Sequence, residues 1–301
     1  MSVIKRSYHH EDDYEAVGEF LHSTSNLGTS HRNWVQPRWE YAHYHPYLDD
    51  KNMDRWAVWE EAGRIVGIAH YEHRMGTAHF QLAPEHGELK RAMLEHAMAQ
   101  LAAKSDNGSS VQVYIGERDT EFAGIASACG FTKLGIEESE PTRIFRIPEP
   151  FPEIRVPEGY RVIGLDEDDD SRKVHRVMHR GFNHPGEPPE EDLPSRAHKL
   201  SAPNLRKDLN VVAVEPGGQF VAYCGMWYID RHKTAYVEPV ATDPDHRRKG
   251  LGTAVVMEGI RRCARLGATA AFVGSDQLFY QSMGFEPFDR QVAWRRIIEP
   301  V

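Results

Sequence analysis

The feature of the sequence that most restricts the fold is that one order of elements occurs twice. Residues 55–73 and residues 210–230 each predict two strands joined by a tight turn, and another strand and a helical pattern follow in both halves. Each half ends near a Gly-Phe pair, and Phe285 follows Phe131 by 154 residues, about half of the 301-residue chain. This internal repeat predicts two tandem domains, each a mixed α/β fold.

The repeats are separated by a proline-dense segment. Residues 147–159 contain four prolines and no hydrophobic periodicity, which is typical of a stiff, extended connector. We therefore predict a first domain at 1–147, a linker at 148–159 and a second domain at 160–301.

Composition excludes several classes of protein. The formal net charge of -9 argues against a general nucleic-acid binder, and the longest apolar runs are too short for a membrane span. Three scattered cysteines predict free thiols and a cytoplasmic location. The histidine pairs have no cysteine or acidic companions at a recognisable spacing, so we predict no metal site. We expect a monomer or a homodimer.

Positive charge and glycine gather at one predicted helix start, directly after a strand. Backbone N–H groups in the first turn of a helix lack intrahelical acceptors, and the helix dipole adds partial positive charge there. Glycine lets an oxygen approach the backbone closely, so the segment predicts a diphosphate cradle, with an exposed basic turn as the alternative. The cradle residues are Arg247, Arg248, Lys249, Gly250, Leu251, Gly252 and Thr253.

This segment resembles motif A of the GNAT superfamily, the Gcn5-related N-acetyltransferases, which reads Gln/Arg-x-x-Gly-x-Gly/Ala between a strand and a helix. The preceding residues 240–244 are similar to the family's Val-x-Val-x-Pro strand end, with Thr242 at the second valine. Downstream, Tyr280 to Phe285 resembles the family's Tyr-x-x-x-Gly-Phe ending, although the family's usual Asn before the tyrosine is missing. The resemblance covers residues 160–290 by motif and residues 3–145 only by element order.

The resemblance implies two tandem GNAT-like acyl-CoA N-acyltransferase domains, with acetyl-CoA or a close acyl-CoA as co-substrate. It implies transfer of an acetyl group to a primary amine of a small molecule or peptide by direct attack on the thioester. Main-chain groups of Val240, Ala241 and Thr242 would bind the pantetheine arm.

Two side chains are candidates for proton transfer. By resemblance, Tyr280 would protonate the leaving thiolate; its alternative role is a packing aromatic. Glu238 would deprotonate the amine, and strand alternation predicts that it shares a face with Thr242. Its alternative role is a buried, structurally hydrogen-bonded carboxylate.

The first half lacks these features. After Pro84 the loop is shorter and has Glu85 and Glu88 in place of the cations, and Ala126 stands at the position of the tyrosine. Carboxylates would repel a diphosphate, so we predict that the first domain has lost acyl-CoA catalysis. It would serve as a scaffold or contribute to substrate binding.

Two segments are candidates for holding the acceptor. The stretch around Trp34, Trp39 and Tyr47 is rich in aromatic residues and predicts either a pocket or an aromatic mini-core. The acidic run from Glu187 to Asp192 would hold an amine or form a solvated loop. A function of another class also fits the cradle, namely a non-catalytic acyl-CoA-binding sensor, but the presence of Tyr280 and Glu238 favours the enzyme.

Overall fold

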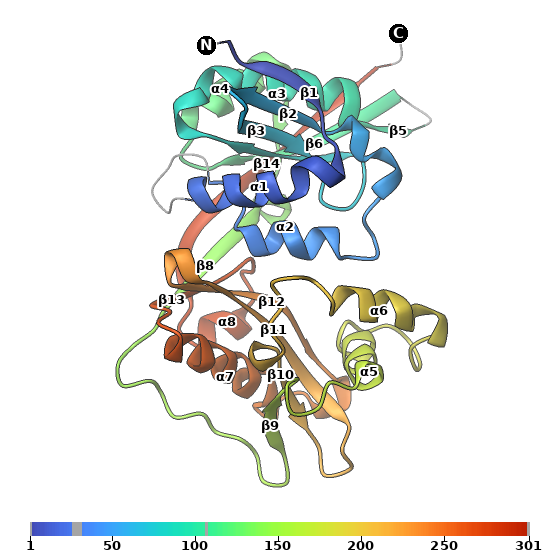
Figure 1. Ribbon diagram of the computed structural model, residues 1–301, viewed down its shortest axis with the longest axis vertical. Coiled ribbons are helices and arrows are strands. Elements are labelled where there is room, and N and C mark those ends of the chain that lie inside the picture. Colours follow the sequence, from blue (N-terminus) through green and yellow to red (C-terminus); the bar gives the residue numbers. More distant parts are fainter. Residues whose placement is uncertain (1, 26–31, 106–107, 300–301) are drawn as a thin grey trace. The chain divides into compact units, whose positions relative to one another are not determined.

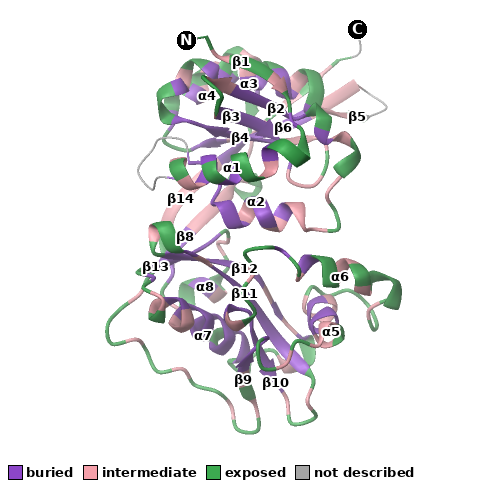
Figure 2. Ribbon diagram, in the orientation of Figure 1, coloured by how far each residue is buried: buried purple, intermediate pink, exposed green. Residues whose placement is uncertain are grey.

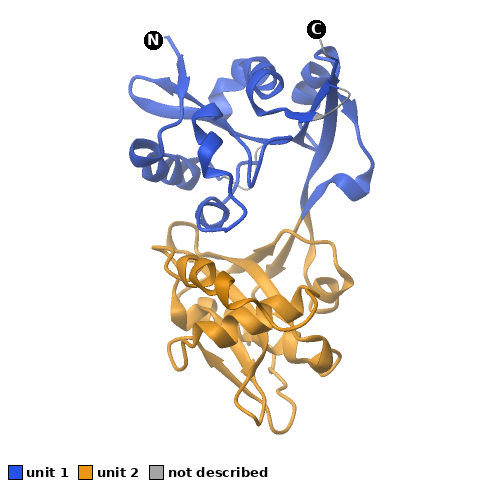
Figure 3. Ribbon diagram, turned by 90° about the vertical axis from the view of Figure 1, so that its right-hand side faces the viewer, with its two compact units in different colours: residues 1–141, 289–301 blue, residues 142–288 orange. Residues whose placement is uncertain are grey.

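The computed structural model describes residues 2–25, 32–105 and 108–299. The chain forms two compact units, shown in different colours in Figure 3. Unit 1 consists of Met1–Pro141 and Asp289–Val301, and unit 2 consists of Thr142–Phe288. No helix among the described residues is both long enough and apolar enough to cross a membrane.

Unit 1 is built on a mixed sheet in the order β1-β2-β3-β4-β6-β14 (Figure 1). Neighbouring strands are antiparallel except for the pair β4 and β6, which is parallel. Its helices pack in two pairs, α1 with α2 and α3 with α4. The bounds are β1 (Ile4–Ser7), α1 (His10–Thr24), α2 (Gln36–His43), β2 (Ala57–Glu61), β3 (Arg64–His70), β4 (Thr77–Leu82), α3 (Lys90–His96), β6 (Gly108–Gly116), α4 (Thr120–Ala128) and residues 289–298 of β14 (Glu286–Ile298). Two short strands, β5 (Ala103–Ser105) and β7 (Thr132–Lys133), pair with β6 and β14.

Unit 2 repeats this plan, with a sheet in the order β9-β10-β11-β12-β13-β8. Only the pair β12 and β13 is parallel. The bounds are β8 (Glu140–Arg146), β9 (Arg161–Gly164), α5 (Ser171–Gly181), α6 (Leu193–Lys199), β10 (Val211–Val214), β11 (Phe220–Ile229), β12 (Thr234–Thr242), α7 (Leu251–Arg265), β13 (Ala270–Val273) and α8 (Leu278–Ser282). The predicted mixed α/β fold, present twice, is therefore confirmed.

The central strands of the unit 2 sheet are buried, as the purple ribbons of β10 and β11 in Figure 2 show. Val211 and Ala213 of β10 belong to a core with residues of α7, whereas Val212 and Val214 belong to a second core with residues of α5. Successive side chains of a strand point to opposite faces, so the sheet lies between the two helix layers.

The final strands of the two units are exchanged along the chain. Residues 143–146 of β8 pair with β13 in unit 2, although they precede the rest of that unit. Gln291–Ile298 of β14 pair with β6 in unit 1, at the far end of the sequence. The compact units therefore differ from the sequence-based boundaries at 147 and 160. Residues 148–159 lie in unit 2 and form no helix or strand.

Candidate functional site

The parallel strands β12 and β13 of unit 2 separate partway along their length. They pair only at Thr234, Ala235 and Tyr236, while β12 continues to Thr242. Beyond Tyr236, the edge of β12 that faces β13 has no partner strand among the described residues, so its main-chain groups are open to a ligand. Val240, Ala241 and Thr242 all lie in this part of β12.

A bulge interrupts β12 at Glu238. Met226 of β11 faces Val237, whereas Cys224 faces Val240, so β12 contains one extra residue between these pairs. Val237 and Val240 consequently both contribute to the core against α7. The strand alternation that we used to place Glu238 and Thr242 on one face does not run through this region. The bulge removes the basis of that prediction, because it resets the period of two.

The loop before α7 has the conformation of an anion site. Arg248 and Gly250 have positive φ angles of 61° and 83°, whereas the φ angle of Lys249 between them is not positive. Alternation of this kind turns successive N–H groups toward one side. The N–H of Ala254 donates to the Gly250 carbonyl at 2.9 Å, which is the first hydrogen bond of the helix. The N–H groups of residues 251–253 come before it in the chain, in the first turn, where N–H groups have no acceptor within the helix. The structure thus directs several backbone donors at one point.

The two glycines of the motif have different physical roles. A Cβ atom at Gly250 would meet nothing within 4 Å, but its φ of 83° is one that other residues rarely adopt. A Cβ atom at Gly252 would lie 3.0 Å from Oγ1 of Thr242 and 3.2 Å from the ring of Phe279. We had predicted that both glycines allow an oxygen to approach; Gly252 also allows α7 to pack on β12 and α8.

The three cations of the motif are not equivalent. Arg247 donates from Nε to the Thr242 carbonyl at 3.1 Å and from Nη2 to the Gly181 carbonyl and Asn183 Oδ1, both at 2.8 Å. Nζ of Lys249 donates to the Tyr160 hydroxyl at 3.2 Å. Arg248 makes no side-chain hydrogen bond or ion pair with the described residues, so its charge is the most available to a ligand.

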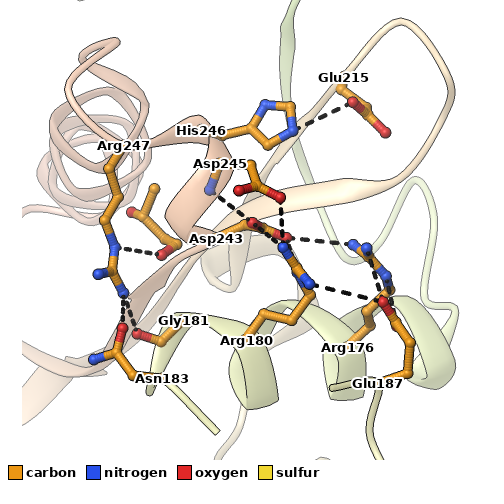
Figure 4. A network of polar contacts seen from close by, with 11 residues as sticks. Arg176, Arg180, Gly181, Asn183, Glu187, Glu215, Asp243, Asp245, His246 and Arg247 are labelled. Carbon is orange, nitrogen blue, oxygen red and sulfur yellow. Dashed lines mark hydrogen bonds and ion pairs between the residues drawn. The ribbon is translucent and has the colours of Figure 1, made fainter. Parts of the chain in front are cut away.

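Carboxylates close to the cradle are matched by arginines of α5 (Figure 4). Asp243 is buried and accepts from Arg180 at 2.6 Å, and Arg180 also binds Asp245 at 2.6 Å. Burial alone would raise the pKa of Asp243, but the hydrogen bonds from Arg180 and the Asp245 backbone lower it, so the group is ionised and paired. These negative charges are therefore largely compensated and repel an anion little.

Tyr280 lies on α8 and is 7% exposed. Its ring packs edge-on against Phe279 and Phe285, with centroids 5.0 and 5.6 Å away. Burial, followed by the charges of Cys224 and Glu238, raises the pKa of the phenol, so it keeps its proton at neutral pH. The ring therefore packs in the core and also carries a proton that it could donate.

Glu238 lies within electrostatic reach of both Tyr280 on α8 and Lys199 on α6, since its charge affects the pKa of each. Its carbonyl accepts from Nε1 of Trp227 at 2.9 Å. Lys199 is 7% exposed, and burial, followed by the charge of Arg196, lowers its pKa to about 6, against the opposing effect of Glu238. Lys199 was not among the site residues predicted from the sequence. A single lysine in a polar helix gave no signal of burial.

The acidic run after α5 is largely a surface feature. Glu187 binds Arg176 at 2.9 Å, and Glu190 binds Arg172, with both carboxylates exposed. Of the run, Glu187 alone is tied through Arg176 to the cradle segment, at Asp243.

The corresponding helix start in unit 1 is built differently. A 3-10 helix, η2 (Pro84–Leu89), stands between β4 and α3, and none of its residues has a positive φ. Buried Lys90 begins α3 and binds Asp119 at 3.0 Å and Glu121 at 2.6 Å. A Cβ atom at Gly87 would lie 3.8 Å from a Glu121 oxygen. In unit 1, a carboxylate of the unit itself thus lies beside this loop. In unit 2, the corresponding loop presents backbone N–H groups instead.

The aromatic residues of the first half form part of the core of unit 1. Trp34 and Trp39 are 4% and 1% exposed, whereas Tyr47 is 67% exposed and lies outside that core. The structure therefore supports the mini-core and not the pocket.

Next to this mini-core, unit 1 contains a donor group that sequence spacing did not indicate. Glu72, His79 and Glu140 each place a ligand atom within 4.8 Å of the others. Arg38 donates to both carboxylates, at 2.9 Å to Glu72 and 2.8 Å to Glu140, and stacks on Trp34. A divalent cation would lie against this guanidinium, so the arrangement fits an internal ion-pair network better than a metal site.

Comparisons with known proteins agree with this geometry. The model of the acetyltransferase (GNAT) family matches residues 172–285. No curated protein sequence matches the chain significantly.

Solved structures resemble the whole chain. A tandem GNAT protein from the clavulanic acid biosynthesis pathway is 18% identical with a TM-score of 0.67, and the match covers 100% of both chains. A GCN5-related N-acetyltransferase from Sphaerobacter thermophilus is 17% identical with a TM-score of 0.61, covering 99% of this chain and 96% of that one. N-myristoyltransferase from Saccharomyces cerevisiae, with bound myristoyl-CoA, is 11% identical with a TM-score of 0.56, covering 98% and 79%.

At these identities the solved structures show the fold, and the family model shows the sequence pattern of the second unit. The second unit therefore carries a GNAT domain, and the chain as a whole has the fold of tandem GNAT proteins.

Proposed function

We propose that unit 2 is an N-acetyltransferase that moves the acetyl group of acetyl-CoA to a primary amine of a small molecule or peptide. The observation that carries the proposal is the loop with alternating φ at Arg248–Gly250, placed at the start of α7 and next to the open edge of β12. Backbone donors, a helix N-terminus and an uncompensated arginine meet there, which suits a diphosphate.

Binding would use the main chain more than side chains. The N–H groups of residues 248–253 would hold the diphosphate, and the open edge of β12 around Val240 would bind the pantetheine arm. The main-chain groups of Ala241 face β11, where this residue pairs with Tyr223. The carbonyl of Thr242 already accepts from Arg247, so it contributes little to this edge. Arg248 adds charge at the mouth of the cradle.

A base and an acid would move protons during the reaction, and three side chains are candidates for these two roles. The neutral amine forms a bond to the thioester carbon, and the bond from that carbon to sulfur breaks. Glu238 would take the first proton, which the ammonium gives up before attack, and buried Tyr280 would donate its proton to the leaving thiolate. The nitrogen loses a second proton as the amide forms, and that proton would return Tyr280 to its neutral form. Lys199 would be mostly neutral at pH 7, so it is a second candidate for the base.

In the same proposal, unit 1 binds no acyl-CoA. Its helix start has no alternating φ, Glu121 lies beside the loop, and Ala126 replaces the tyrosine. Unit 1 would then act as a scaffold or contribute to acceptor binding. We also propose a cytoplasmic location, because the three free cysteines suit a reducing compartment.

Two measurements test this function. Calorimetry with acetyl-CoA is expected to give one binding site per chain. A second equivalent site would disprove the proposal that unit 1 binds no acyl-CoA. A panel of amines and aminoglycosides, assayed by thiol release from acetyl-CoA, is expected to find an acceptor. Tight binding of acetyl-CoA without turnover on any amine would favour the alternative function, a non-catalytic acyl-CoA-binding sensor.

A further inference from the structure

The guanidinium of Arg247 connects the cradle loop to helix α5 (Figure 4). Arg247 precedes the residues whose N–H groups form the cradle, yet its side chain extends to Gly181 and Asn183, on and just after α5. A third hydrogen bond reaches the Thr242 carbonyl at the end of β12. One side chain thus fixes three segments that are distant in sequence.

These acceptors explain why an arginine suits this position. Gly181 is the last residue of α5, and the carbonyls of a C-terminal turn lack intrahelical partners and favour a cation. Asn183 has a φ of 62°, so the chain turns sharply there and presents its side-chain oxygen to Arg247. Arginine has several donors in a planar fork and can satisfy all three oxygens at once.

The end of α5 also packs directly on β12. A Cβ atom at Gly181 would lie 2.7 Å from Cβ of Ala241 and 2.9 Å from the nitrogen of Thr242. Movement of the helix end would therefore disturb the strand edge that faces the gap between β12 and β13.

A second connection runs parallel to the first. Arg176 on α5 binds Asp243 at 3.4 Å and also Glu187, in the segment after the helix, at 2.9 Å. The segment between α5 and α6 is thus tied to the cradle at Asn183 through Arg247 and at Glu187 through Arg176. Both ties end on residues 242–247.

We propose that Arg247 is a positioning residue that couples occupation of the acyl-CoA cradle to the order of residues 182–192. The coupling rests on the proposed function in one respect, namely that acetyl-CoA occupies the cradle. The acceptors of Arg247 are neutral oxygens, so its charge is not cancelled by a carboxylate. A diphosphate on the neighbouring N–H groups would attract that charge and hold the side chain in place, which in turn holds Gly181 and Asn183.

Hydrogen exchange on the full chain tests the coupling without knowledge of the acceptor. Three amides report on the segment: Phe182 donates to Met178 at 3.0 Å, Asn183 to Arg180 at 2.9 Å and His184 to His179 at 3.1 Å. In the free protein, Arg247→Met should speed exchange at these amides by roughly tenfold, the scale of a lost charged hydrogen bond. Saturating acetyl-CoA should slow the same amides in the parent protein and leave them unchanged in the variant.

Three further variants separate positioning from charge. Arg248→Met removes the adjacent cation, so it should weaken acetyl-CoA binding while exchange at residues 182–184 of the free protein stays as in the parent. Asn183→Gly tolerates the positive φ but removes the acceptor, so it should reproduce part of the Arg247→Met effect. Asn183→Asp keeps an acceptor and should restore exchange to the parental rate.

The outcomes are distinguishable. If Arg247→Met leaves exchange at 182–184 unchanged in the free protein, or if acetyl-CoA protects the cradle but not these amides in the parent, the coupling is overturned. If acetyl-CoA fails to protect residues 248–254 at all, the proposed function fails, and the free-protein comparison still decides whether Arg247 positions the segment.

Discussion

The helix that follows the parallel strand begins differently in the two units. In unit 2, α7 starts at Leu251 after two residues with positive φ, and its first N–H groups are open. In unit 1, η2 separates β4 from α3, and Lys90 at the start of α3 binds Asp119 and Glu121. In our proposal, an anion binds where the loop opens the helix start, and it does not bind where the unit supplies its own carboxylates.

The sheet itself does not explain this difference. In unit 1, the parallel strands β4 and β6 pair only at Thr77 and Ala78, although β4 continues to Leu82. The strands of unit 1 therefore separate as β12 and β13 do in unit 2. If unit 1 binds no acyl-CoA, as we propose, a gap in the sheet is not sufficient for binding, and the conformation and charge of the next loop decide it.

The exchange of final strands gives the largest expected effect. A fragment of residues 142–288 contains every strand of the unit 2 sheet, and in it Arg143 can bind Asp276 and the Phe285 carbonyl. A fragment of residues 160–301 lacks the strand that covers β13 and carries residues 289–298 without a partner. We expect the first to unfold cooperatively in circular dichroism and the second to aggregate, because unpaired edges promote association. Equal stability of the two fragments would show that the exchanged strand is dispensable.

Tyr280→Phe tests the chemical difference between Tyr280 in unit 2 and Ala126 in unit 1. Loss of the hydroxyl should lower turnover by roughly a hundredfold, within the usual range for a general acid, with little change in acetyl-CoA affinity. Steady-state kinetics and calorimetry measure the two quantities. Tyr228→Phe is the control, since it removes another phenol of unit 2, whose partners are the Leu266 carbonyl and Asp230 Oδ1. If Tyr280→Phe turns over as fast as the parent protein, the ring serves packing alone.

Gly250→Ala tests the loop conformation directly. A residue other than glycine at a φ of 83° costs about 1–3 kcal/mol, so acetyl-CoA binding should weaken by roughly tenfold to a hundredfold. Gly250→Asn should lose less, because asparagine tolerates this conformation better.

The matched change in unit 1 is Gly87→Ala, where a Cβ atom meets nothing closer than 3.8 Å. It should leave acetyl-CoA affinity unaltered. Weaker binding in this variant would place a ligand in unit 1.

The sequence predicted the repeated fold and the basic helix start because hydrophobic periodicity and glycine positions are local signals. The exchange of strands was not predictable in this way. Residues 143–146 and 291–298 both read as ordinary strands, and nothing local assigns a strand to one sheet or the other. The bulge did have a signal, since proline inside a strand, here Pro239, is usually confined to edges or bulges.

Side-chain roles were harder to predict. The identity of Arg247 suggested a phosphate ligand, whereas its three acceptors lie on β12, on α5 and just after α5, segments that only the tertiary structure brings together. The burial of Lys199 likewise depends on how α6 packs.

Acid should destabilise unit 1 more than unit 2. Burial lowers the pKa of His43 to about 3 and of His96 to about 4, and it also lowers the pKa values of His70 and His79, all in unit 1. The unfolded chain binds protons near pH 6.5 and the folded unit does not, so the stabilisation is present above that pH and is lost as pH falls toward 4. A loss of about 2 kcal/mol by pH 5 would lower the Tm by roughly 4–8 °C.

Intrinsic fluorescence suits this measurement, because Trp227 alone of the six tryptophans lies in unit 2. A fluorescence-detected Tm that is the same at pH 5 and pH 7.5 would contradict the prediction. In unit 2, burial lowers the pKa of His175. This is one histidine against the four named in unit 1, so exchange protection of unit 2 should change less over the same range.

The smallest effect, and the one that separates two candidate bases, concerns Glu238 and Lys199. Unit 1 has no acyl-CoA chemistry in our proposal, so any pH dependence of turnover belongs to unit 2. If Glu238 is the base, Glu238→Gln should lower the rate about tenfold at pH 7 and erase the limb along which the rate rises with pH. The loss should shrink near pH ~10, where an alkyl ammonium gives up its proton unaided.

If Lys199 is the base, the limb along which the rate rises with pH lies near the Lys199 pKa of about 6. Glu238 raises that pKa, so Glu238→Gln would then move the limb to lower pH and leave the plateau intact. Lys199→Met completes the test, because it should keep the plateau if Glu238 is the base and abolish it if Lys199 is.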